Sequence, residues 1–180
     1  MTDRIKALNI DKQAEFFMPP RVVDELLSFF DDKEQPFLQD FLAVVIIKSP
    51  DQHALNVSAT IFYQYVDETR QRAYRGLNAA EEEIQKAARL MMGKEELGKK
   101  EFEMTVGPVV KAFRDRYRQA TRYGFIDSVA DLDLIMLAKE TGGYLVTTDE
   151  GVIRWGRIFG IKELPAHVFG SVLRGAEEKT

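Results

Sequence analysis

The sequence contains no cysteine, which excludes disulfides, a thiolate nucleophile and cysteine-ligated zinc. It has only two histidines, His53 and His167, which lie far apart and show no metal-ligand spacing. The longest unbroken apolar run, Phe41–Ile47, is too short to span a bilayer, and polar residues stand where a signal peptide would be apolar. Motifs of nucleotide-binding loops, zinc proteases and serine hydrolases are also missing. These absences favour a soluble, cytoplasmic protein.

The small net charge of −4 conceals an uneven distribution along the 180 residues. Residues 69–122 hold 13 basic and 8 acidic side chains, a balance of +5, which leaves −9 for the rest of the chain. The sum alone argues against a nucleic-acid ligand, but such asymmetry is more informative than the sum. It suggests a basic module joined to an acidic one.

Hydrophobic spacing divides the chain into an α/β domain, residues 1–57 and 123–180, and an inserted helical hairpin, residues 58–122. In the hairpin, apolar residues recur at steps of three and four from Phe62 to Met91 and again from Val106 to Ala120, which predicts two long antiparallel helices. Their apolar seams are narrow and can bury little surface alone. We therefore expect the hairpin to project or to pair with another subunit.

On either side of the hairpin, helix and strand patterns alternate, which implies a three-layer α/β/α domain with a parallel sheet. Strands are predicted at Glu15–Met18, Val44–Ile47, Tyr144–Thr147 and Ile161–Leu164, of which Val44–Ile47 could also be a buried helix end. Helices are predicted at Thr2–Asp11, from Pro20 to Phe30, at Gln35–Ala43, between Ser128 and Gly142, after Asp149 and after Pro165.

Four aspartates, Asp127, Asp131, Asp133 and Asp149, form the most concentrated chemical signal. Asp127 and Asp131 can share one side of a helix start, and Asp149 follows a predicted strand, at the sheet edge where open α/β folds bind ligands. Carboxylates gathered without basic partners repel one another unless a hard divalent cation joins them. Two such cations about 4 Å apart can promote phosphodiester cleavage. Alternatively, Asp127 and Asp131 only cap a helix, Asp133 faces solvent and Asp149 starts a turn.

The second chemical signal is a set of basic residues on the two predicted hairpin helices. Lys111, Arg114, Arg118 and Arg122 are spaced as one stripe on the second hairpin helix, and Arg70, Arg72 and Arg75 cluster on the first. Rows of arginine suit phosphate backbones and the shape of RNA. Alternatively, the stripe is a solvated helical face with ion pairs to Glu81–Glu83 or Asp115.

Several segments resemble known families. Leu145–Asp149, preceded by Asp131–Ala138, resembles the C-terminal half of a PIN-type metallonuclease, and Met18–Glu25 resembles the PIN segment whose helical glutamate, here Glu25, joins the metal site. Further segments are similar to the HARP family of small protein-only ribonuclease P enzymes: Ala14–Pro19, Lys48–Pro50, Arg75–Leu77, Ile126–Ser128, Asp149–Gly151 and Gly160–Ile161. The similarity covers nearly the whole chain, including the hairpin.

The resemblance implies a PIN-like fold and endonucleolytic removal of the 5′ leader from precursor tRNA. It implies Mg²⁺ or Mn²⁺ held by Asp127, Asp131, Asp133 and Asp149, with Glu25 as a further ligand. It also implies that the inserted helices bind tRNA and mediate homo-oligomerisation, with no membrane partner. Two other functions stay open: a non-catalytic tRNA-binding or scaffold protein, and a less selective PIN ribonuclease.

One departure concerns the start of the domain. PIN proteins open with an apolar strand that ends in aspartate, whereas Asp3 and Asp11 are not preceded by apolar runs. That strand is normally central in the sheet, so its loss would leave backbone groups of neighbouring strands unpaired in the core. We therefore expect the chain to lack the first strand of the fold, and to show impaired folding and little or no cleavage without it.

Overall fold

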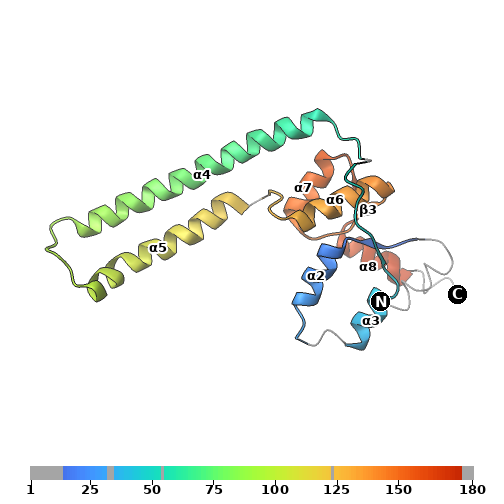
Figure 1. Ribbon diagram of the computed structural model, residues 1–180, viewed down its shortest axis with the longest axis horizontal. Coiled ribbons are helices and arrows are strands. Elements are labelled where there is room, and N and C mark those ends of the chain that lie inside the picture. The colour runs from blue at the N-terminus through green and yellow to red at the C-terminus, as the bar shows by residue number, and fades with distance from the viewer. Residues whose placement is uncertain (1–13, 32–34, 54, 123, 176–180) are drawn as a thin grey trace. The chain divides into compact units, whose positions relative to one another are not determined.

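The computed structural model describes residues 14–31, 35–53, 55–122 and 124–175. They form two compact units (Figure 1): residues 59–125, called the helical unit here, and the described residues before and after it, called the α/β unit. The helix predicted at Thr2–Asp11 lies outside the described residues. Across the part of the chain that the structure describes, no helix combines the length and apolarity needed to cross a membrane.

The α/β unit contains two pairs of short parallel strands, which agrees with the expected fold class. β1 (Phe17–Met18) pairs with β2 (Ile46–Ile47), and β3 (Tyr144–Leu145) pairs with β4 (Lys162–Glu163). All four lie within the predicted strand segments, and Val44–Ile47 ends as a strand rather than a helix. The strands are shorter than the hydrophobic runs, however, and the described residues show two separate pairs instead of one continuous sheet.

Helices surround these strands close to the predicted positions. They are α2 (Pro20–Ser28), α3 (Pro36–Leu42), α6 (Val129–Thr141), α7 (Glu150–Ile158) and α8 (Ala166–Gly175). Pro20 and Pro36 each stand at the start of a helix, where the missing N–H of proline has no intrahelical partner to lose. The sequence signals for helix starts are therefore confirmed at both positions.

The core of the α/β unit lies where α6 and α7 meet β3. Ile135, Leu137, Leu145, Val152 and Trp155 are each at most 3% exposed. Gly156 allows α7 to approach β3 closely, because a Cβ at this position would lie 2.7 Å from a methyl carbon of Leu145. This packing fixes the start of α6 relative to the start of α7. The predicted aspartates lie at these two helix starts.

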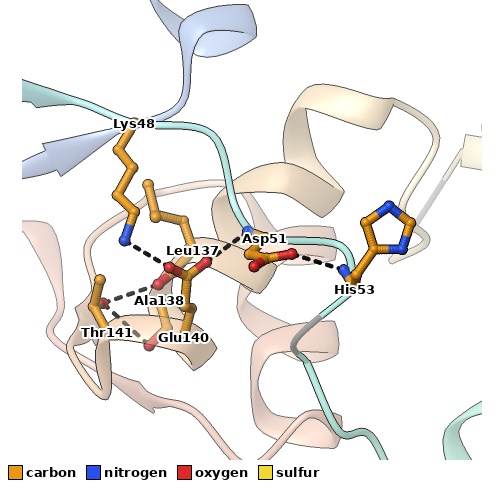
Figure 2. A network of polar contacts seen from close by, with 7 residues as sticks. All are labelled: Lys48, Asp51, His53, Leu137, Ala138, Glu140 and Thr141. Carbon is orange, nitrogen blue, oxygen red and sulfur yellow. Dashed lines mark hydrogen bonds and ion pairs between the residues drawn. The ribbon is translucent and has the colours of Figure 1, made fainter.

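A polar network ties the C-terminal turn of α6 to the segment that follows β2 (Figure 2). The two carboxylate oxygens of Glu140 accept hydrogen bonds from Lys48 Nζ, at 2.6 Å, and from the backbone N of Asp51, at 2.7 Å. Asp51 Oδ1 accepts a further bond from the backbone N of His53 at 2.9 Å. The backbone N of Lys48 donates to the Met18 carbonyl at 3.1 Å, next to the paired strands. One carboxylate therefore fixes the chain as it leaves β2.

The helical unit consists of α4 (Ala59–Met91) and α5 (Lys99–Arg122), which run antiparallel and pack along each other (Figure 1). They begin where the sequence predicts, after Ser58 and Gly98. Gly76 marks a close approach, since a Cβ there would lie 2.7 Å from the Tyr117 ring. Arg75 Nε donates to the Ala120 carbonyl at 2.7 Å and joins the two helices at another point.

Candidate functional site

The start of α6 positions the first of the predicted aspartates. Ser128 is the N-cap, and its Oγ accepts a hydrogen bond from the backbone N of Asp131 at 3.0 Å, as the sequence predicts. This bond satisfies one of the amides that have no partner within the helix. At the other end, Gly142 stops the helix with φ +64°, a conformation that glycine adopts without a Cβ clash. Local sequence therefore places Asp131 in the first turn.

Two of the predicted carboxylates, Asp127 and Asp149, act electrostatically on a third, Asp131. Burial raises the pKa of Asp131 above its usual value, a hydrogen bond with Ser128 opposes this, and the charges of Asp149 and Asp127 raise the pKa further. Asp131 is thus in an environment that disfavours its ionised form. A cation bound beside Asp131 would stabilise its ionised form. This favours the interpretation of Asp131 as a metal ligand over that of a simple capping residue.

Asp149 is the N-cap of α7. Its Oδ1 accepts a hydrogen bond from the backbone N of Val152 at 2.9 Å, and its own backbone N donates to Thr147 Oγ1 at 3.1 Å. Asp149 therefore caps a helix, whereas the sequence offered only the start of a turn as the alternative to metal binding. Capping is compatible with metal binding, because a carboxylate has two oxygens and about four lone-pair sites.

Asp133 is placed differently from its neighbours. It is 6% exposed, and its Oδ2 accepts a hydrogen bond from Arg21 Nη1 of α2 at 2.8 Å. Residues two apart on a helix do not face the same way, so Asp133 lies away from the face of Asp131. The alternative in which Asp133 is solvated is wrong. Glu25 lies exposed on α2, with its backbone carbonyl accepting a bond from Ser28 Oγ at 2.7 Å.

The donor chemistry of Asp127, Asp131 and Asp149 fits a hard divalent cation, because carboxylate oxygens are the ligands that Mg²⁺ and Mn²⁺ prefer. Their geometry is less complete. Among the residues that the structure describes, no group of three or more acidic or histidine side chains is arranged to hold a metal ion. The chain therefore brings the right chemistry to the starts of α6 and α7 without closing a coordination shell there.

The predicted RNA-binding residues all lie on the helical unit: Arg70, Arg72 and Arg75 on α4, and Lys111, Arg114, Arg118 and Arg122 on α5. Arg72 and Arg75 also take part in packing, since the Arg72 guanidinium lies 3.9 Å from the centre of the Phe125 ring and Arg75 binds Ala120. Lys111, Arg114 and Arg118 line one groove along α5 with apolar neighbours that include Val106 and Val110. Three of the four members of the stripe therefore share one surface.

An ion-pair cluster in the helical unit escaped sequence analysis. Arg116 donates to Glu83 at 2.7 Å and to Glu82 at 2.6 Å, and Lys86 donates to Glu83 at 2.6 Å. Glu83 is 3% exposed, and the hydrogen bonds from Lys86 and Arg116 hold its pKa below the usual value. The sequence left open that residues of the basic stripe form ion pairs with Glu81–Glu83. In the structure such ion pairs are made by Arg116, which is outside the predicted stripe. Within the stripe, Arg118 lies 3.8 Å from Asp115.

The structure combines the features that the family resemblance implies. These are an α/β unit with parallel strands, carboxylates at two helix starts and a basic helical unit. A family profile described as PINc domain ribonuclease matches residues 1–176. A protein named RNA-free ribonuclease P from Hyperthermus butylicus is 36% identical over 176 residues, which cover 95% of this chain and 74% of the relative.

Two further relatives carry the same name. The protein from Thermodesulfovibrio yellowstonii is 36% identical over 172 residues, which cover 96% of this chain and 80% of the relative. The protein from Pyrococcus horikoshii is 31% identical over 173 residues, which cover 96% and 78%. The chain therefore belongs to the PINc domain ribonucleases and, among them, to the HARP family of RNA-free ribonuclease P proteins.

Proposed function

We propose that this protein is a metal-dependent endoribonuclease that removes the 5′ leader from precursor tRNA without an RNA subunit. The observation that carries this proposal is the 36% identity, over 95% of the chain, with a protein named RNA-free ribonuclease P. The match to the PINc domain ribonuclease family over residues 1–176 supports the same reaction class, the hydrolysis of a phosphodiester bond in RNA.

In this proposal Asp127, Asp131 and Asp149 hold the divalent cation, Mg²⁺ or Mn²⁺. When bound, the cation supplies charge neutralisation at the scissile phosphate and activates water. The effect of the Asp149 and Asp127 charges on Asp131 supports this assignment. Asp133 and Glu25 are the other two proposed ligands. Asp133 would first have to leave Arg21, whose guanidinium already neutralises it.

We assign RNA binding to the basic residues of the helical unit, which corresponds to the proposed hairpin insertion at residues 58–122. Lys111, Arg114 and Arg118 share one groove, and Arg122 continues the row on α5. Long basic side chains along a helix can follow a phosphate backbone. Arg70, Arg72 and Arg75 of α4 would add contacts near the Arg122 end of the row, since Arg75 binds the Ala120 carbonyl.

We assign homo-oligomerisation to the apolar seam of α4. Its members Phe62, Val66, Leu77 and Ile84 are between 53% and 67% exposed. Large apolar side chains repeated along one helix are a typical interaction surface, and burial against a second copy would remove them from water.

We further propose that the two strand pairs belong to one parallel sheet. A cavity of about 1020 Å³ supports this, because its lining includes both Ala14–Met18 around β1 and Gly143–Thr147 around β3. Apolar side chains of α3, α6 and α8, such as Phe41, Leu134 and Phe169, also line it.

Cleavage of precursor tRNA tests the proposed function. The protein is assayed with Mg²⁺ and precursor tRNA, and an unstructured RNA of similar length is the comparison substrate. We expect release of the leader from precursor tRNA, and no release when Mg²⁺ is removed with EDTA. Equal cleavage of unstructured RNA would instead indicate a less selective ribonuclease.

A non-catalytic tRNA-binding protein is the second candidate. The observation that favours it is the lack, among the described residues, of three acidic or histidine side chains arranged for a metal ion. Tight binding of precursor tRNA with no cleavage and no Mn²⁺ binding would support this candidate and contradict the first.

A further inference from the structure

The groove along α5 contains carboxylates as well as cations. A surface that only followed phosphates would gain from basic side chains alone, because every carboxylate beside them repels a phosphate backbone. The acidic side chains in the groove therefore need an explanation of their own. The charged residues that line it are Glu103, Lys111, Arg114, Asp115 and Arg118.

Asp115 lies between two of the cations along the helix. Lys111 precedes it by four residues and Arg118 follows it by three, so the three side chains share one side of α5. At 1.5 Å per residue, Asp115 is about 6 Å along the axis from Lys111 and about 4.5 Å from Arg118. Glu103 is about 12 Å along the axis from Lys111. Of the two acidic residues that line the groove, Asp115 is thus the one with a cation on either side.

The carboxylate of Asp115 is accessible to a bound molecule. Its side chain is 56% exposed, and that of Arg118 is 64% exposed. Arg118 Nη1 lies 3.8 Å from Asp115 Oδ1, which is longer than a hydrogen bond. Arg118 therefore leaves the oxygens of Asp115 able to accept hydrogen bonds from a ligand in the groove.

RNA carries a group that suits a carboxylate between two cations. Along one strand each ribose separates two phosphates, and its 2′-hydroxyl donates a hydrogen bond, whereas DNA has no such donor. An ionised carboxylate only accepts hydrogen bonds. Asp115 would thus be paired when RNA lies in the groove and left unpaired beside DNA, and an unpaired charge is one way in which a site rejects the wrong ligand.

We propose that Asp115 is a specificity-determining residue of the groove. It accepts a hydrogen bond from a ribose 2′-hydroxyl of the bound strand, while Lys111 and Arg118 contact the phosphates on either side, so that the groove selects RNA over DNA. This inference rests on the proposed function, in which RNA binds along α5. It adds recognition of the sugar to a surface whose cations attract the phosphates of either nucleic acid.

Equilibrium binding of precursor tRNA and of single-stranded DNA with the same sequence tests the proposal. Binding is measured by fluorescence anisotropy at one salt concentration, without divalent cations so that the RNA stays intact. We expect the wild type to prefer RNA, and Asp115→Ala to reduce this preference about tenfold, the size of one hydrogen bond to a charged group. A preference within about twofold of the wild-type value in Asp115→Ala, or a wild type that binds both equally, would overturn the proposal.

Glu101→Ala is the matched control, because Glu101 is an exposed acidic residue of α5 that does not line the groove. Removing its charge should strengthen the binding of RNA and DNA by the same factor and leave the preference unchanged. An equal loss of preference in Glu101→Ala and Asp115→Ala would attribute the effect to net charge and contradict the role of Asp115.

The salt dependence of RNA binding separates a direct contact from a displaced Arg118. Asp115 contacts no phosphate in this proposal, so Asp115→Ala should keep the slope of log affinity against log salt. A slope reduced by roughly 0.7 to 0.9 would indicate a lost phosphate contact and argue against a direct role. A changed sedimentation of Asp115→Ala without RNA, with an unchanged preference, would instead assign the groove to a second copy of the chain.

Binding preference and cleavage are independent measurements. A wild type that prefers RNA through Asp115 but releases no leader from precursor tRNA would count against the proposed function alone. A protein that releases the leader, and whose preference for RNA is the same with and without Asp115, would count against this inference alone.

Discussion

The Arg21 guanidinium lies 2.8 Å from the buried carboxylate of Asp133, so one predicted metal ligand already has a cation of the protein as its partner. Asp133 is two residues from Asp131, yet the two carboxylates have different surroundings: Asp133 faces a positive charge, and Asp131 faces Asp127 and Asp149. This contrast separates a structural aspartate from the group proposed to bind metal, and it can be tested.

Replacing Arg21 with alanine should destabilise the α/β unit, because Asp133 would stay buried without its ion-pair partner. The expected loss is about 2 kcal/mol in the free energy of unfolding, measured with urea. Asp133→Asn should cost less, since Arg21 is more than half exposed and can turn to water. If Asp133 binds metal only when it is released from Arg21, Arg21→Ala should also tighten Mn²⁺ binding. An unchanged Mn²⁺ affinity would show that the role of Asp133 is structural.

Asp131→Asn should have opposite effects on stability and activity. Because the folded protein raises the pKa of Asp131, ionisation of this group disfavours folding, and the penalty appears as the pH rises through the ordinary and then the raised pKa. We therefore expect the variant to be more stable than the wild type at pH 7, to lose that advantage at low pH, and to cleave no RNA. Thermal unfolding at both pH values checks the sign. Lower stability at pH 7 would contradict this account of Asp131.

Glu83 should contribute stability to the helical unit with the opposite pH dependence. Its pKa is lowered by Lys86 and Arg116, so its contribution is present above the ordinary pKa of glutamate and disappears as the pH falls through the lowered value. Glu83→Gln should unfold at a lower temperature at pH 7 and differ less from the wild type in acid. A constant difference at all pH values would show that packing, not charge, explains the effect.

Lys111→Ala, Arg114→Ala and Arg118→Ala should each weaken binding of precursor tRNA. Each lost phosphate contact should also reduce the slope of log affinity against log salt by roughly 0.7 to 0.9. Arg89→Ala is a matched control, because Arg89 is an exposed arginine of α4 outside the stripe. Equal losses for Arg89 and the stripe variants would indicate unspecific attraction between the basic unit and RNA.

Local signals in the sequence predicted most element boundaries. Ser128 and Gly142 bound α6, and Pro20 and Pro36 begin α2 and α3, because capping and proline preferences act over a few residues. The capping role of Asp149, in contrast, was not predicted, because the sequence indicated only the start of a turn there. The family resemblance, rather than spacing, supplied the substrate class.

Long-range pairs could not be predicted in this way. Arg21 and Asp133 are 112 residues apart, and Lys48 and Glu140 are 92 residues apart. Helical periodicity indicates which residues share a face, but not which carboxylate meets which cation after the chain has folded. The separate orientation of Asp133 could have been noticed, since residues two apart on a helix face different directions.

The most direct measurement of the central proposal is the 5′ end formed when the wild-type protein and Asp149→Asn are each incubated with precursor tRNA and Mg²⁺. Asparagine caps a helix about as well as aspartate, so Asp149→Asn keeps the start of α7 while removing the charge. We predict that the wild type releases the leader at the mature 5′ end and that Asp149→Asn binds the tRNA without cleaving it. Equal cleavage by both proteins, or none by the wild type, would contradict the proposal.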